Sequence, residues 1–393
     1  MKAVFFLALS ALIAVIALST GWEIMFRLFY TMVGAAFISF IWARGNVRWL
    51  WYKYEIKTHR AEVGGKIEER LTLENTSFLP KLWLEIRDHS TLIGHRGTRV
   101  VGLGSYARRT FDLVTPCRVR GEFTLGPVQV ASGDPFGLFR RQRKLEIGGK
   151  VLVYPAITWL QSFGRLPGEL PGGNVQTERT PFSTPNAAGI RDYQSGDAMN
   201  RIHWLSTIRL GRLMVKEFDL DPISDVWLVI DLDDQVQVGT GQDATVEWSV
   251  SVTASLASYF SRQDRQLGLV TQRHVLPVDR GERQLYKVLD LLAVVKSDSS
   301  IPLEELLLAN ENLFRRGATV IVVTSSTDER WLGMCNLLLA RGITVLAVLL
   351  EASTFGGRQS SLSAFSSLIG TGVPTYLVKL GDNLAMALAQ PAG

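Results

Sequence analysis

The sequence predicts an α/β fold of the Rossmann-like kind in its C-terminal part, preceded by a β-rich domain and a hydrophobic helical hairpin. Three observations lead to this prediction. Val, Ile and Leu runs alternate with helical patterns after residue 222, short alternating runs fill residues 50–155, and two long apolar runs lie before residue 45. Near-continuous apolar strands that alternate with helices are typical of a mostly parallel sheet covered on both faces.

Composition excludes several classes of protein. With 47% apolar and 20% charged residues, the chain is neither disordered nor a polytopic transporter. The formal net charge of +5 is spread along the chain without a basic block, so we expect no nucleic-acid binding. Cys117 and Cys335 lack metal-ligand spacing, and we expect them to be small core residues in a reducing compartment.

Residues 1–45 are expected to form a transmembrane hairpin. Residues 3–19 are apolar and uncharged, and residues 24–42 are apolar except for Arg27 near their start, so each run has about the length of a membrane-spanning helix. The short link between them forces an antiparallel pair. A secretory signal peptide is the alternative for the first run, since Lys2 precedes it, but the second run directly behind it favours an anchor.

Basic residues predict the side of the membrane on which the domains lie. Lys2 precedes the first run, while Arg44, Arg48 and Lys53 follow the second. By the positive-inside rule, both ends of the hairpin face the cytoplasm. We therefore expect a protein of the cell membrane with two transmembrane helices in contact with lipid and its soluble domains on the cytoplasmic side.

The soluble part divides into three segments. Residues 50–155 predict a β-sandwich-like domain, because turn signals recur about every ten residues between alternating β-branched and aromatic residues. Residues 156–190, rich in Gly, Pro, Thr and Asn, predict an irregular connector. Residues 222–393 predict the α/β domain, with strands at DVWLVID, LGLVT, ATVIVVT, ITVLAVLL and PTYLVKL. Ligands of such folds bind beyond the carboxyl ends of the strands.

Carboxylates follow the first of these strands. Asp231, Asp233 and Asp234 could bind Mg²⁺, which prefers oxygen ligands. The alternative, which we favour, is a metal-free loop of solvated carboxylates, so no cofactor is expected. Other catalytic patterns are weak: Ser195 lacks the glycine two positions earlier that G-x-S-x-G requires, and the histidines show no H-x-x-x-H spacing. We therefore expect no enzyme.

One charged stretch, RDYQSGDAMNRIHW at residues 191–204, stands apart from the apolar runs around it. Asp197 is predicted to cap a helix that starts near Ala198 and ends at Arg209 and Gly211, after which RLMVKEFD leaves as a strand. Arg191, Arg201 and Arg209 could converge on a phosphate or on the acidic tail of a partner.

A structural role is the interpretation we favour for this stretch. In it, Arg–Asp pairs brace two domains with Trp204 packed between them. The enzymatic alternative is a hydrolase with its site around Asp192, Asp197 and His203.

SGDPFGLFR at residues 132–140 and GIRDYQSGDAMNRIHWLSTIRLGRLMVKEFD at residues 189–219 together resemble the DUF58 family. Many members carry S-A-R after the Trp, where this chain has STIR, and Arg209 is the candidate equivalent. The matching positions are Arg191, Tyr193, Gly196, Asp197, Arg201, Trp204, Leu213, Val215, Lys216 and Glu217.

This resemblance implies a layout and a role. DUF58 proteins combine a membrane hairpin, a β-rich segment and a von Willebrand A-like domain, and their biochemical function is unknown. They tend to be encoded near MoxR-type AAA+ ATPases, transglutaminase-like proteins and other von Willebrand A proteins, which implies a non-enzymatic adaptor in protein maturation or complex assembly. Asp231 matches the first position of the metal-binding D-x-S-x-S of von Willebrand A domains. Asp233 and Gln235 replace its serines, and Ser325 stands where an acidic residue is expected, so bound Mg²⁺ is not implied.

Overall fold

The computed structural model describes residues 2–95, 97–163, 187–194, 199, 202–218 and 225–391, with the backbone alone for 187–190 and 216–218. The chain divides into two compact units. The first comprises Met1–Thr158, Thr240–Ser255 and Tyr286–Ser297, and the second comprises Trp159–Gly239, Leu256–Leu285 and Asp298–Gly393.

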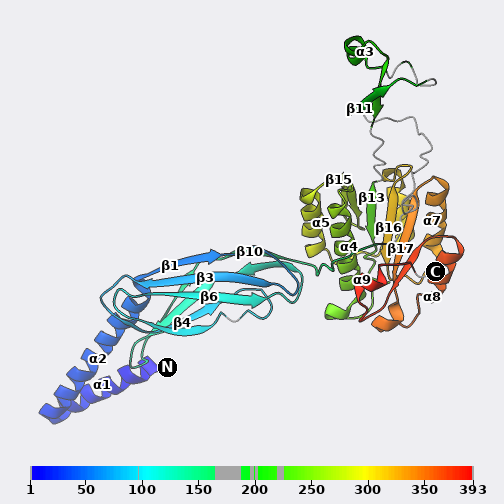
Figure 1. The fold of residues 1–393 in the computed structure, drawn as a ribbon. Coiled ribbons are helices and arrows are strands. Elements are labelled where there is room, and N and C mark those ends of the chain that lie inside the picture. The colour runs from blue at the N-terminus through cyan, green and yellow to red at the C-terminus, as the bar shows by residue number, and fades with distance from the viewer. Residues whose placement is uncertain are drawn as a thin grey trace. The chain divides into compact units, whose positions relative to one another are not determined.

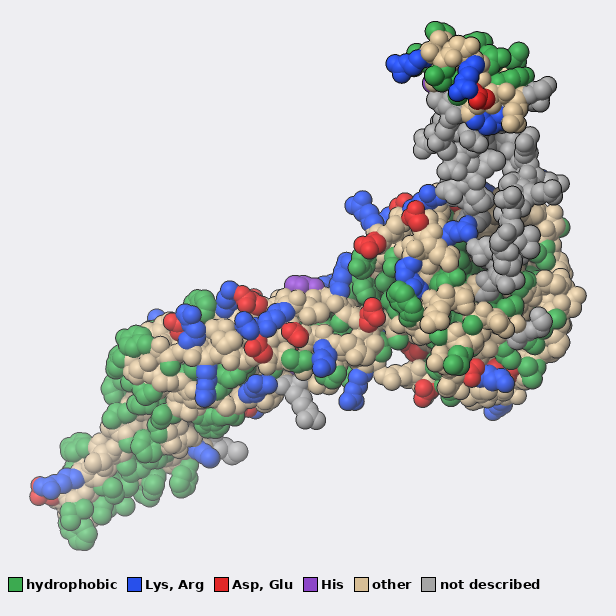
Figure 2. Space-filling model, viewed as in Figure 1, with side chains coloured by type: hydrophobic (Ala, Val, Ile, Leu, Met, Phe, Trp, Pro, Cys, Tyr) green, Lys and Arg blue, Asp and Glu red, His purple; other side chains and the backbone are tan. Residues whose placement is uncertain are grey.

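Two N-terminal helices, α1 (Lys2–Thr20) and α2 (Glu23–Arg48), form a hairpin closed at Gly21, whose φ of 71° suits glycine (Figure 1). Both helices are long and apolar enough to cross a membrane. Figure 2 shows hydrophobic side chains covering their surface. The two predicted helices are confirmed, but α2 continues past the predicted end at residue 42 to Arg48, where it packs against the β-rich region.

The β-rich region of the first unit contains strands β1 to β10. Their bounds are Leu50–Ile56, Arg60–Glu62, Lys66–Asn75, Lys81–Asp88, Arg99–Leu103, Arg108–Pro116, Gly121–Leu125, Val128–Gly133, Arg140–Leu145 and Gly149–Tyr154. They form sheets in the orders β1-β3-β6, β5-β4-β8-β9 and β2-β10-β7. All these pairings are antiparallel except that of β2 with β10.

The core of this region lies between the first two sheets. Leu71 and Leu73 of β3 pack with Leu84 and Ile86 of β4 and with Val130 of β8, all of them buried. Burial alternates strictly along β3, as the two-residue period of a strand requires. A polar residue at an inward position of β3 is therefore forced into the core.

The second unit holds the elements of the C-terminal half, together with parts of α4 and α5. The elements are β11 Ala187–Asp192, α3 Trp204–Leu210, β12 Met214–Phe218, β13 Val226–Ile230, α4 Thr245–Arg262, β14 Leu267–Val270, β15 Val275–Asp279, α5 Glu282–Val294, α6 Leu303–Asn310, β16 Thr319–Thr324, α7 Arg330–Ala340, β17 Thr344–Leu350, α8 Leu362–Gly370, β18 Thr375–Val378 and α9 Leu384–Ala387. Short 3-10 helices span Gly241–Asp243, Glu311–Leu313 and Ala352–Phe355.

A six-stranded sheet in the order β15-β14-β13-β16-β17-β18 organises the α/β region. All pairs are parallel except β14 with the edge strand β15. The mixed α/β class predicted for this region is confirmed. Because the chain runs from β13 to β14 on one side and later to β16 on the other, the strand order reverses at β13.

Apolar side chains cover the sheet. One cluster joins Val229 and Val320 of the strands with Leu307 of α6 and Trp331 of α7, all 3% exposed or less. Phe163 stacks on Tyr376 of β18 with ring centroids 4.6 Å apart, although it lies in the segment predicted as an irregular connector. Residues 164–186 of that predicted connector lie outside the described residues.

Candidate functional site

A short helix on a two-stranded sheet carries the charged stretch. Strands β11 and β12 pair antiparallel, with Arg191 opposite Val215 and Asp192 opposite Met214. Helix α3 lies between them in sequence. It begins at Trp204, not near Ala198 as predicted, because Ile202 pairs with Val215 as an extension of the strands.

Local hydrogen bonds fix both ends of α3. The ring nitrogen Nδ1 of His203 accepts the backbone N–H of Ser206 at 3.3 Å and so caps the first turn. At the other end Gly211 has a φ of 67°, and its N–H donates to the carbonyl of Thr207. The predicted end of the helix is confirmed, whereas its cap is His203. Asp197, the predicted cap, lies outside the described residues.

The charged residues of this stretch that are described make local contacts. Asp192 pairs with Arg212 at 3.1 Å, and both side chains are more than half exposed. Nη1 of Arg191 donates to the carbonyl of Asp192 at 3.0 Å, and Arg209 lies in the last turn of α3.

The remaining members of the predicted set are placed only in part. The backbone N–H of Tyr193 donates to Leu213, which continues the pairing of β11 and β12. Lys216 and Glu217 stand opposite Ile190 and Gly189. Gly196 and Arg201 lie outside the described residues.

An exposed apolar surface is the main feature of this segment. Trp204 is 63% exposed and Ile208 80%, so neither packs into a core. We call this set the α3 surface: Met199, Trp204, Leu205, Ile208, Leu210 and Leu213, all of them exposed. Large exposed apolar patches on soluble parts of proteins mark interaction sites.

Asp231 lies at the carboxyl end of β13, where the strand order of the sheet reverses, and is fully buried. Its Oδ2 accepts the hydroxyl of Thr324 at 2.7 Å, and its Oδ1 accepts from Nε2 of Gln272 at 2.9 Å and from the backbone N–H of Asp233 at 3.2 Å. Burial raises the pKa of Asp231 to about 6, although these hydrogen bonds oppose the rise.

The surroundings of Asp231 do not fit the Mg²⁺ of a von Willebrand A domain. Protein donors already reach both of its oxygens, and Oδ1 of Asp233 accepts the backbone N–H of Gln235 at 3.0 Å. The hydroxyl of Ser325 donates to the carbonyl of Val236, so it too is engaged. Mg²⁺ needs several oxygen ligands in one shell. Asp233 and Gln235 replace the two serines that would supply some of them, and the hydroxyls of Thr324 and Ser325 donate to Asp231 and Val236.

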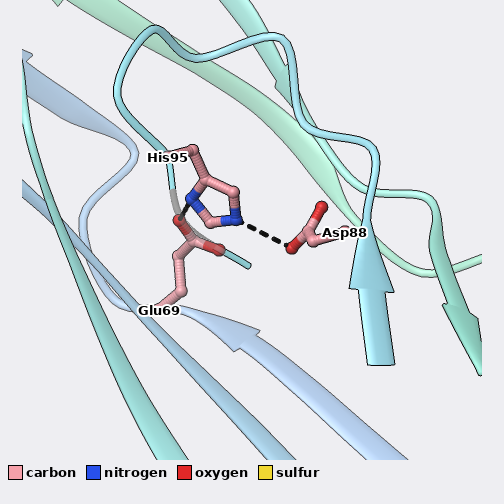
Figure 3. Close-up of side chains that lie close together, drawn as sticks. All are labelled: Glu69, Asp88 and His95. Carbon is pink, nitrogen blue, oxygen red and sulfur yellow. Dashed lines mark ion pairs between the residues drawn. The ribbon is translucent and has the colours of Figure 1, made fainter. Parts of the chain in front are cut away.

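Glu69, Asp88 and His95 form a buried charged cluster in the β-rich region (Figure 3). Nε2 of His95 lies 3.0 Å from Oδ2 of Asp88, and its Nδ1 lies 3.6 Å from Oε1 of Glu69. Each side chain is 3% exposed or less. The Asp88 hydrogen bond raises the pKa of His95, and burial raises that of Glu69.

The geometry of this cluster favours an ion-pair network. The two carboxylates lie against different nitrogens of the His95 ring, as in an ion-pair network, and one ligand atom from each of the three side chains lies within 4.8 Å of the others. Nδ1 of His95 also lies 3.0 Å from Oγ1 of Thr115, and the hydroxyl of Tyr54 donates to Glu69. A protonated His95 would lie within ion-pair distance of both acids.

Sequence spacing does not reveal this cluster, because its residues come from β3, β4 and the loop that follows. The signal that could have found it is the inward position of Glu69 between Ile67 and Leu71 in an alternating strand.

Part of this chain is similar to a described protein family. Residues 189–353 match the family described as "Protein of unknown function DUF58". The DUF58 match begins within β11 and ends just beyond β17, so it contains both the α3 surface and Asp231.

One curated relative resembles part of this chain. Over 237 residues the chain is 27% identical to "Uncharacterized protein YeaD" of Bacillus subtilis (strain 168), an alignment that covers 58% of this chain and 56% of that protein. The chain thus spans about half the length of this relative.

Solved structures show only distant likeness. Proximal thread matrix protein 1 from the mussel byssus has a TM-score of 0.31 and 12% identity, covering 42% of this chain and 46% of that one. The CARDB domain of the PF1109 protein from Pyrococcus furiosus has a TM-score of 0.21 and 10% identity, covering 26% and 91%. Likeness at these TM-scores carries no argument.

Proposed function

We propose that this chain is a membrane-anchored, non-enzymatic adaptor that works with a MoxR-type AAA+ ATPase in maturing or assembling other proteins. The α3 surface is the observation that carries the proposal. It presents Trp204, Leu205 and Ile208 on one short helix next to Arg209 and Arg212, within the segment that matches DUF58. Trp and Arg are enriched in binding hot spots, and the apolar side chains around them exclude water.

The chemistry of the described residues supports binding over catalysis. Nδ1 of His203 caps α3, and Asp192 is paired with Arg212, so both side chains have structural partners within this segment. Asp231 is inaccessible and fully hydrogen bonded. These contacts leave the segment with a surface for a partner.

The anchor in this proposal is the α1–α2 hairpin. Each helix is long and apolar enough to cross a bilayer, and Arg44 and Arg48 at the end of α2 favour the cytoplasmic side for the domains. That side is also where a cytoplasmic ATPase would meet the α3 surface.

The α/β region is proposed to be von Willebrand A-like, without a metal at the carboxyl ends of its strands. Asp231 and Thr324 stand at the ends of adjacent parallel strands, where such domains hold their metal, and they bond to each other. Other von Willebrand A or transglutaminase-like proteins are the further partners that the family resemblance implies.

Co-purification tests the adaptor role. The full chain is extracted from its native membranes in a mild detergent with nucleotide, and the associated proteins are identified by mass spectrometry. We expect a MoxR-type ATPase with the wild type and its loss with Leu205→Asp/Ile208→Asp, because two charges disrupt the α3 surface. Met386→Asp is a control, since Met386 is 78% exposed on α9 outside this surface.

A further inference from the structure

A cluster of arginines surrounds a pocket where α2 meets the β-rich region. The pocket has a volume of about 400 Å³. Its lining is Arg44, Val47, Arg48, Arg141, Gln142 and Arg143. We call it the arginine pocket. Arg44 and Arg48 are one helical turn apart on α2, and Arg141 and Arg143 are two residues apart on β9, so each pair shares a face.

The charge of this pocket is uncompensated among the residues that the structure describes. None of its four arginines pairs with a described carboxylate, whereas the neighbouring Arg140 pairs with Glu85. Four guanidinium groups held around one hollow repel one another, and an anion placed between them relieves that repulsion.

Aromatic rings hold two of the arginines in place. The guanidinium of Arg141 lies 5.9 Å from the ring centre of Phe40, and that of Arg143 lies 5.7 Å from that of Tyr52. Such cation–π contacts orient the side chain while leaving its N–H groups available. Arg supplies planar, bidentate recognition of phosphate oxygens.

The pocket lies at a depth that suits lipid headgroups. The apolar run of α2 ends at Trp42, so Arg44 and Arg48 lie about 3 and 9 Å further along the helix axis at a rise of about 1.5 Å per residue. The headgroup layer on each side of a bilayer is about 5–7 Å thick. Both arginines therefore fall within or just outside this layer.

Exposed apolar residues surround the same end of the β-rich region. Trp49 directly follows α2. Leu82 and Trp83 follow Lys81, which contacts Gly45 of α2. Phe136 lies in the same turn as Phe139, which packs on Phe40 of α2. The exposed residues of this group are Trp49, Phe78, Leu82, Trp83 and Phe136. Aromatic residues are enriched at membrane interfaces, so this end has the composition of a surface that rests on lipid.

We propose that the arginine pocket binds the phosphate of an anionic phospholipid headgroup. This inference rests on the membrane hairpin of the proposed function, but not on the ATPase partner. The bound lipid would fix the depth and tilt of the β-rich region at the membrane surface.

Native mass spectrometry of the detergent-solubilised full chain tests this site, with phosphatidylglycerol and phosphatidylcholine as probes. We expect the wild type to retain phosphatidylglycerol selectively. Arg141→Gln/Arg143→Gln should weaken that binding about 30-fold, since a basic residue near an anionic lipid surface contributes about fivefold. Arg141→Lys/Arg143→Lys, which keeps the charge, should bind with an intermediate affinity.

A charge-matched control lies on the same strand. Arg140→Gln/Lys144→Gln removes two charges from positions of β9 that do not line the pocket, and should bind like the wild type. Two results would overturn the site: equal weakening of lipid binding in Arg141→Gln/Arg143→Gln and Arg140→Gln/Lys144→Gln, or no preference of the wild type for phosphatidylglycerol. Displacement of the lipid by millimolar inorganic phosphate would overturn the lipid as its ligand. Retention of each variant in alkali-washed membranes separates these outcomes from failure of the anchor.

Discussion

Burial controls the chemistry of Asp231. Its pKa is raised to about 6, so the folded chain binds a proton there more tightly than the unfolded chain does. Between the ordinary value near 3.8 and about 6, stability therefore falls as pH rises, and it stays lower at higher pH. The carboxylate is retained at the fully buried end of β13 although it destabilises the fold at neutral pH.

Asp231→Asn should remove this pH dependence. We expect the stability of the variant minus that of the wild type to increase by on the order of 2 kcal/mol from pH 4 to pH 7, because only the wild type has a charge to bury. Hydrogen exchange of β13 and β16 peptides, compared with the wild type at each pH, measures the gain. Asp234→Asn, at an exposed neighbour of Asp233, is the control. A constant difference between Asp231→Asn and wild type across this range would contradict the account.

His95 predicts a pH dependence in the β-rich region. Its pKa is raised by Asp88, so its contribution to stability is complete below the unfolded value near 6.5 and is lost as pH rises through the folded pKa. We expect protection of β3 and β4 amides in the wild type to weaken above that range relative to His95→Gln. The exposed His89 gives a matched control in His89→Gln, which should follow the wild type. Identical profiles for His95→Gln and wild type would show that His95 is neutral in the fold.

At the scale of elements, the junction of α2 with the β-rich region depends on a buried lysine. Nζ of Lys81 donates to the carbonyl of Gly45 at 2.5 Å, which satisfies a carbonyl in the last turn of α2, and Nδ2 of Asn46 donates to Oγ of Ser132 at 3.1 Å. Burial lowers the pKa of Lys81 to about 8. With a pKa of about 8, Lys81 is still mostly protonated at neutral pH, where it donates to the end of α2.

Lys81→Met should loosen this junction. The carbonyl of Gly45 would remain buried without its donor, at a cost of about 1–3 kcal/mol. We expect faster hydrogen exchange in the last turn of α2 and a lower Tm in detergent. Lys144→Met, at an exposed position of β9, should leave both unchanged. Unchanged exchange in Lys81→Met would mean that other contacts hold α2 in place.

Elements were predicted well where their hydrophobic pattern is long. The apolar runs of α1 and α2 and the strands β13, β16 and β17, which are buried at every position except Thr344, need only local composition to be recognised. The edge strand β15 was missed because VLPVD is short, contains Pro277 and is half exposed. The start of α3 was misplaced because pairing of Ile202 with Val215 overrides helical spacing.

The candidate sites show the same limit. Asp231 could be predicted as a candidate because it directly follows a buried strand, and ligands of α/β sheets bind beyond the carboxyl ends of the strands. The arginine pocket and the His95 cluster could not, since each joins residues distant in sequence through the packing of α2 on β9 or through the pairing of strands. Nor does sequence spacing show that Trp204 and Ile208 are exposed, because the same spacing fits a buried helix face.

At the scale of the whole molecule, the chain combines a hydrophobic hairpin, a β-rich region and an α/β region that carries the α3 surface. In the proposed adaptor role, the hairpin spans the membrane, the arginine pocket binds a lipid headgroup, and the α3 surface binds a partner protein. The internal bonding of Asp231 leaves the α/β region as a scaffold for that surface.

Co-purification from native membranes tests the central claim most directly, because recovery of a cytoplasmic ATPase requires the anchor, the cytoplasmic side and the α3 surface together. The account predicts that a MoxR-type ATPase is recovered with the wild type and with Met386→Asp, and is lost with Leu205→Asp/Ile208→Asp. Equal recovery with all three proteins would contradict the role of the α3 surface, and recovery with none would contradict the adaptor.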